Sequence, residues 1–112
     1  MYSNEEIMQF VNLVVEATDP DKIILFGSYV YGSPIEKSDL DFLVIKNGKD
    51  ITRDEHADLT TAVWLKRKQY RIRARYDIFF CTDQQVQESA ENGGVFVDAI
   101  LRGRVVYERA GQ

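Results

Sequence analysis

Two aspartates and a glycine–serine pair are the residues of this sequence whose types and spacing could do chemistry. Gly27 and Ser28 follow a short apolar run, and Asp39 and Asp41 stand directly before a second apolar run that begins at Phe42. The pattern predicts a strand, a tight glycine turn, a short connection and a second strand. The polar groups would then gather at one end of a sheet.

The glycine–serine turn is suited to binding phosphate. Gly27 has no Cβ, so the backbone there can approach a ligand closely. Ser28 adds a hydroxyl, and the residues after it can start a helical turn whose open N–H groups favour phosphate oxygens. A plain strand-ending turn is the alternative, and the position between a buried strand and an acid pair favours the phosphate site.

The acid pair is suited to binding a divalent metal. Asp39 and Asp41 are two residues apart at the start of an expected strand, so their side chains share a face, with Cα atoms roughly 7 Å apart. Leu40 between them would point into the core. Mg²⁺ prefers a few carboxylates, water and substrate phosphates. A helix cap or solvated loop is the alternative, since Ser38 and Asp39 are good capping residues.

The combined motif resembles a known family signature. Gly-Ser, ten residues and Asp-x-Asp is similar to the signature of nucleotidyltransferases of the DNA polymerase β superfamily, and the short chain is similar to its minimal nucleotidyltransferase (MNT) group. The resemblance implies a third carboxylate on a later strand, for which the sequence offers Asp77. Many family members carry arginine where this chain has Tyr29 or Tyr31.

The resemblance also implies a role for each motif residue. Catalysis and the binding of two Mg²⁺ ions would fall to Asp39, Asp41 and Asp77, with Asp77 also acting as base toward the acceptor hydroxyl. Nucleotide binding would fall to Gly27, Ser28 and Ser38, with ATP as the substrate.

Asp77 tests this assignment most directly. Its apolar neighbours, Tyr76 and residues 78–80, indicate a buried strand. A buried carboxylate without a partner is costly, so a metal or another cation should lie near it. The alternative is a charge on an edge strand that faces water.

Length and composition limit the class of protein. The 112 residues suggest a single domain over 1–112, and the net charge of −4 argues against broad coating of nucleic acid. There is no run of about 18 apolar residues and no sign of a secretory signal, so no membrane partner is expected. Cys81, the single cysteine, rules out an internal disulfide, and the cytoplasm is the expected compartment.

Helices are expected to alternate with strands along the chain. The predicted strands cover residues 22–26, 40–46, 74–81 and 105–107. The predicted helices cover 3–18, a stretch from 53, a short stretch from Thr82, and 95–101. The helix from 53 has one apolar face, formed by Leu59, Ala62, Val63 and Tyr70. This order predicts an α/β or α+β fold with helices packed on a mixed sheet of three to four strands. The resemblance implies the polymerase β-like nucleotidyltransferase fold.

A partner protein is expected to supply the acceptor. The chain has no room for an acceptor domain, and MNT proteins are commonly paired with a HEPN-domain toxin, an RNase. The resemblance implies an antitoxin that adds AMP to a tyrosine of that toxin. Two alternatives stay open: a partner-binding module without activity, and an antibiotic-type enzyme that uses a dimer interface. No direct nucleic-acid partner is expected.

A basic cluster of residues 66–75 follows the second expected helix. It contains Lys66, Arg67, Lys68, Arg71, Arg73 and Arg75. Cations suit the C-terminal end of a helix. Docking of an acidic partner or a nucleotide tail is the functional alternative, and Trp64 beside the cluster could be a core residue or a partner contact.

Overall fold

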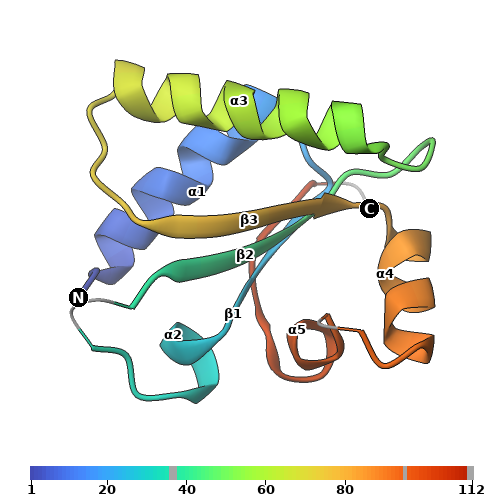
Figure 1. The fold of residues 1–112 in the computed structure, drawn as a ribbon. Helices are drawn as coiled ribbons and strands as arrows, with labels where there is room; N and C mark the ends of the chain where they lie inside the picture. Colours follow the sequence, from blue (N-terminus) through green and yellow to red (C-terminus); the bar gives the residue numbers. More distant parts are fainter. Residues whose placement is uncertain (36–37, 95, 111–112) are drawn as a thin grey trace.

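The computed structural model describes residues 1–35, 38–94 and 96–110. Within these residues the strands form one mixed sheet in the order β3-β2-β1-β4 (Figure 1). β1 is antiparallel to both β2 and β4, whereas β2 and β3 are parallel. The strands are β1 (Lys22–Phe26), β2 (Leu40–Ile45), β3 (Tyr76–Cys81) and β4 (Arg104–Glu108).

The helices begin and end close to their expected positions. Ser3 and Glu6 form a capping box at the first helix, and Thr82 and Gln85 form one at the fourth. The expected start of the last helix at Val95 lies outside the described residues. The helices are α1 (Asn4–Thr18), α2 (Ser28–Tyr31), α3 (Arg53–Gln69), α4 (Asp83–Glu91) and α5 (Val97–Arg102). Mixed α/β architecture is therefore confirmed.

Helices cover the two faces of the sheet unequally. The larger core lies between the sheet and the α1/α3 layer, and it includes Phe10, Leu25, Phe42 and Phe80. The smaller core lies on the other face, under α4 and α5, and its buried members are Leu43, Ile45, Val86 and Ala99. Figure 1 shows α3 on one side of the strands and α2 and α5 on the other. The smaller core leaves part of this second face open.

Two expectations about burial were wrong. The run of β1 is apolar without alternation, which predicts burial on both faces, but Ile24 and Phe26 on the second face are only half-buried. α3 was expected to bury a regular stripe, but only Val63 is fully buried, and Tyr70 is 45% exposed. Tyr70 lies at the C-cap, where its hydroxyl donates to Glu16 Oε1 at 2.6 Å.

None of the helices in the described part of the chain is long and apolar enough to cross a membrane.

Candidate active site

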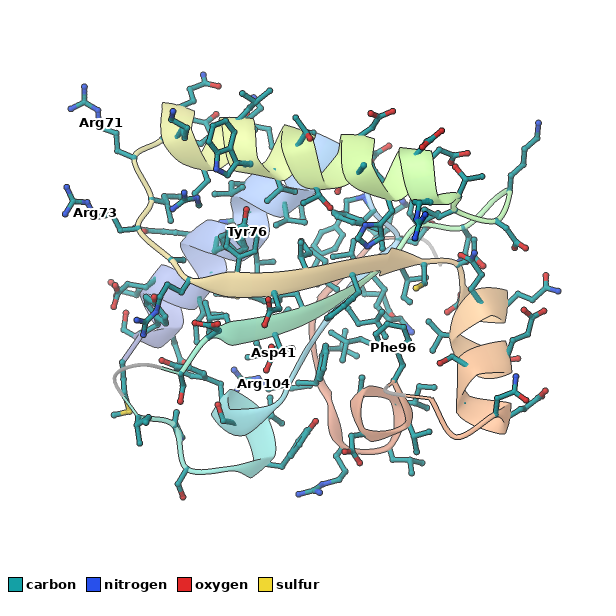
Figure 2. All side chains as sticks on the ribbon, viewed as in Figure 1. Asp41, Arg71, Arg73, Tyr76, Phe96 and Arg104 are labelled. Carbon is teal, nitrogen blue, oxygen red and sulfur yellow. The ribbon has the colours of Figure 1, made fainter. Side chains whose placement is uncertain are left out.

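The parallel register of β2 and β3 brings the acids of two sequence regions together. Asp41 pairs with Asp77 in this ladder, and residues paired across a ladder project from the same face. Leu40 and Phe42 point the other way and are buried under α1 and α3. Figure 2 shows Tyr76 on the α3 side of the sheet and Asp41 on the opposite side. The acids therefore lie on the less covered face.

Asp41 is the most electrostatically stressed of these acids. Partial burial raises the pKa of its carboxyl above the ordinary value, and the nearby carboxylates of Asp77 and Asp39 raise it further. Both causes disfavour the charged form. A cation bound beside Asp41 would relieve them, which is the electrostatic signature expected of a metal-binding position.

Asp39 is held by an arginine in this structure. Its Oδ1 lies 3.4 Å from Nε of Arg75, and both side chains are about half exposed. Among the described residues, no three His, Cys, Asp or Glu side chains are grouped closely enough to hold a metal ion. The donor set fits Mg²⁺ in kind, because it consists of hard carboxylate oxygens on one face. Asp39 would have to turn from Arg75 to join Asp41 at a shared ion.

The close contact with the Asp41 carboxylate leaves no space for a side chain at position 27. The φ of Gly27 is +81°, in the region that favours glycine, and a Cβ at this position would overlap Oδ2 of Asp41. The group that approaches Gly27 closely in this structure is the Asp41 carboxylate, and binding of phosphate at this turn stays a prediction. The N–H groups of Val30 and Tyr31 donate to the Gly27 carbonyl at 3.0 and 3.2 Å, which closes the turn.

The two predicted serines have different surroundings. Ser28 opens α2 beside Gly27, and no described residue forms a hydrogen bond with its hydroxyl. The Ser38 hydroxyl accepts from the Ile35 N–H at 2.9 Å, while the Ser38 N–H donates to the Ile35 carbonyl at 2.9 Å. Ser38 thus closes the loop that leads into Asp39. Contact of either serine with a nucleotide stays a prediction.

Burial of Asp77 was predicted wrongly. β3 is an edge strand, so Asp77 is exposed to solvent even though Ile78 and Phe80 on the opposite face are buried. Ile78 and Phe80 pack under α3, whereas Asp77 projects from the face that α3 does not cover. Phe79 shares that face but packs against two other phenylalanine rings, so Asp77 stays exposed. Its ladder pairing with Asp41 still places it beside the acid pair.

Aromatic side chains lie beside the acids on the same face of the sheet. Phe26 lies opposite Asp41 in the β1–β2 ladder, and its ring centroid is 6.4 Å from that of Phe79. Phe96, which precedes α5, packs edge-on against Phe79 at 5.4 Å (Figure 2). All three phenylalanines are half-buried. The open face is therefore apolar toward α5 and acidic toward the start of β2.

The two tyrosines of α2 have separate roles. The Tyr29 hydroxyl accepts from the Tyr2 N–H at 3.0 Å, and its ring packs against the larger core. The Tyr31 ring instead lies under the guanidinium of Arg102 from α5, with 4.2 Å between the Arg102 Cζ and the ring centroid. Sequence reasoning did not single out Arg102, because only the fold brings α5 beside α2.

Comparison with known proteins identifies the family. The family model described as "Polymerase beta, Nucleotidyltransferase" matches residues 8–112, so the chain belongs to this family. Members generally use a nucleoside triphosphate and a divalent metal, which makes nucleotidyl transfer the class of reaction that the domain supports.

A solved structure shows the same fold. It is a crystal structure from Sulfolobus solfataricus, described as a "putative nucleotidyltransferase", with a TM-score of 0.63 and 15% sequence identity. The match covers 96% of this chain and 81% of that chain. No curated protein matched this sequence significantly.

Proposed function

We propose that this chain transfers AMP from ATP to a hydroxyl group of a partner protein in a Mg²⁺-dependent reaction. The observation that carries the proposal is the ladder pairing of Asp41 with Asp77 beside the Gly27 turn, in a chain of the nucleotidyltransferase family. Two carboxylates at this register share one face, and the raised pKa of Asp41 marks the position where a cation is most favourable.

Each site residue has a distinct task in this reaction. Asp39, Asp41 and Asp77 would hold Mg²⁺, which would neutralise charge on the triphosphate and lower the pKa of the attacking hydroxyl. Asp77 is exposed, so it can accept the proton of an acceptor that arrives from solvent. The acceptor oxygen bonds to the α-phosphorus as the bond to pyrophosphate breaks, and Gly27 and Ser28 orient the leaving phosphates.

The acceptor that we propose is a tyrosine hydroxyl on a HEPN-domain toxin, with this chain as its antitoxin, and an acidic surface of that toxin would dock on the basic cluster. The basic cluster supports such a partner. Lys66 forms an ion pair with Glu16, but Arg71 and Arg73 are exposed and point away from the protein (Figure 2). Trp64, 44% exposed, is not a core residue, and Lys68 lies over its ring at 4.6 Å.

Transfer of a labelled nucleotide tests the proposal. The purified chain is incubated with Mg²⁺ and ATP labelled on the α-phosphate, with and without a HEPN-domain toxin. We expect label on the toxin, and none with the Asp41→Asn variant or with EDTA. Label on an aminoglycoside hydroxyl instead would indicate an antibiotic-type enzyme and overturn the protein acceptor.

A partner-binding module without activity is a second candidate. The Asp39–Arg75 ion pair favours it, because Arg75 occupies a carboxylate that the metal would need. In the same experiment, toxin that binds the chain tightly and gains no label at saturating Mg²⁺ and ATP would support this second function and exclude transfer.

A further inference from the structure

The contact between Arg102 and Tyr31 joins two helices beside the candidate active site. Arg102 is the last residue of α5 and Tyr31 the last of α2. The guanidinium lies over the ring, with 4.2 Å from Cζ to the centroid. None of the ion pairs among the described residues includes Arg102. Its charge is therefore positioned by an aromatic ring and not neutralised by a carboxylate.

The end of α5 is fixed against the strand that leads to the glycine turn. Gly103, directly after Arg102, packs so closely that a Cβ there would overlap the Ala99 carbonyl oxygen and lie 2.5 Å from Cγ2 of Ile24. Ala99 itself is 1% exposed. Ile24 precedes Gly27 by three residues on β1. The backbone that carries Arg102 thus has little freedom to move relative to the turn.

The charges around the turn are unequally distributed. Asp39, Asp41 and Asp77 lie on one side of Gly27, where they would repel the phosphates of a nucleotide as well as bind its metal. Tyr31 and Arg102 lie at the other end of α2 from Gly27. Arg102 is therefore a cation on the α2 side of the turn, and a triphosphate held by the acids would meet it if its terminal phosphates extend along α2.

We propose that Arg102 binds the terminal phosphates of the nucleoside triphosphate and that Tyr31 holds its guanidinium ready to do so. This inference rests on the proposed function, because it assigns a second contact to the same nucleotide. The planar guanidinium can donate two parallel hydrogen bonds to phosphate oxygens while its face stays on the ring. The alternative is an arginine that only complements the C-terminal end of α5.

Nucleotide binding to matched variants tests the inference without requiring catalysis. The affinity of Mg²⁺-ATP and of AMP is measured by calorimetry for the wild type, Arg102→Met and Arg104→Met, with circular dichroism to check the fold. Arg104 is an exposed arginine two residues away that lines the hollow against α1, so it controls for loss of one positive charge.

We expect Arg102→Met to weaken ATP binding roughly tenfold or more, because a charge-assisted contact with phosphate is lost. AMP binding should not change, and Arg104→Met should affect neither ligand. Tyr31→Leu should weaken ATP binding less than Arg102→Met, since the charge remains but is no longer held. Tripolyphosphate, which has no base or ribose, should also bind Arg102→Met roughly tenfold more weakly, because it loses the same contact.

Other outcomes separate the two proposals. If the wild type binds ATP but Arg102→Met binds it equally well, the role of Arg102 is refuted and the proposed function stands. An equal loss in Arg102→Met and Arg104→Met would refute a specific contact. If the wild type binds no ATP with Mg²⁺ at saturating levels, both proposals fail.

Discussion

At the scale of single residues, replacement of Asp41 should affect both metal binding and the stability of the fold. Asp41→Asn removes a metal ligand and also removes repulsion with Asp77 and Asp39. We expect transfer to fall by roughly 10²- to 10³-fold. The free energy of unfolding without metal should stay the same or rise by less than about 1 kcal/mol, because solvent screens these half-exposed charges. Asp50→Asn, an exposed acid in the loop after β2, is the control for activity and for chemical denaturation.

The raised pKa of Asp41 also gives this effect a pH dependence. The folded state binds the Asp41 proton more tightly than the unfolded state, so the contribution of this group to stability falls as pH rises from about 3.9 through the raised pKa. The stability advantage of Asp41→Asn should therefore be largest near neutral pH and shrink in acid. Urea unfolding of both proteins between pH 3 and 7 measures it, and an advantage that grows toward acid would contradict this assignment.

Replacement of Gly27 should cost more stability than replacement of another glycine with positive φ, because a Cβ at Gly27 would also overlap Asp41. Gly27→Ala places a side chain at φ +81° and ψ −157°, a conformation almost confined to glycine that costs about 1–3 kcal/mol, and it adds overlap with the Asp41 carboxylate. Gly93→Ala also has a positive φ, +71°, but open space around its Cβ, so it should show a backbone cost without overlap. Denaturation midpoints compare the two. Equal losses would show that the contact with Asp41 carries no energy.

Residue types and spacing pointed to the glycine turn and to the pair of Asp39 and Asp41, and the resemblance added Asp77 as a third acid. The structure pairs Asp41 with Asp77. Exposure of Asp77 was missed because Ile78 and Phe80 pack on the opposite face, while Phe79 on the same face leaves Asp77 exposed. The contact between Arg102 and Tyr31 joins residues 71 positions apart, and no local pattern reports such a contact.

At the scale of elements, the link from α3 to β3 is the surface most suited to an acidic partner. Arg71 has a φ of 56°, an unfavourable conformation for a side-chain-bearing residue, and Arg73 is exposed beside it. Replacing both with glutamate should weaken binding to the proposed HEPN-domain partner at least tenfold and leave ATP binding unchanged.

Reversal of two other cations is the matched control for this surface. Lys49 and Arg53 are exposed at the opposite end of α3, so Lys49→Glu with Arg53→Glu makes the same change in net charge. Surface plasmon resonance at two salt concentrations compares the pairs. A loss of the same size in both would indicate general charge attraction and no defined docking surface.

Elements with strong end signals were predicted well, and those that depend on tertiary packing were not. Capping residues at α1 and α4 fixed where these helices begin. β3 was expected from residue 74 but begins at Tyr76, because only there does it pair with β2. The burial of the apolar face of α3 was overestimated. This helix packs on α1 and on the edge of the sheet, and these contacts bury only Val63 completely.

At the scale of the whole molecule, ligand binding should be visible as stability. A ligand at 100 times its dissociation constant stabilises the folded state by about 2.7 kcal/mol. For a chain of this length that corresponds to a rise in melting temperature of the order of 10 °C. We expect this rise with Mg²⁺ and ATP together, a smaller one with either alone, and none in Asp41→Asn. Identical melting curves for the wild type with and without both ligands would argue against the site.

The parallel pairing of β2 with β3 has a consequence for how the site could be lost or regulated. Successive side chains of a strand alternate between faces, so sliding the edge strand by a single residue would carry Asp77 around to the helix-packed side and bring an apolar group out in its place. The pairing of the two aspartates therefore depends on a single register of the edge strand, and a change that shifts this register would separate them.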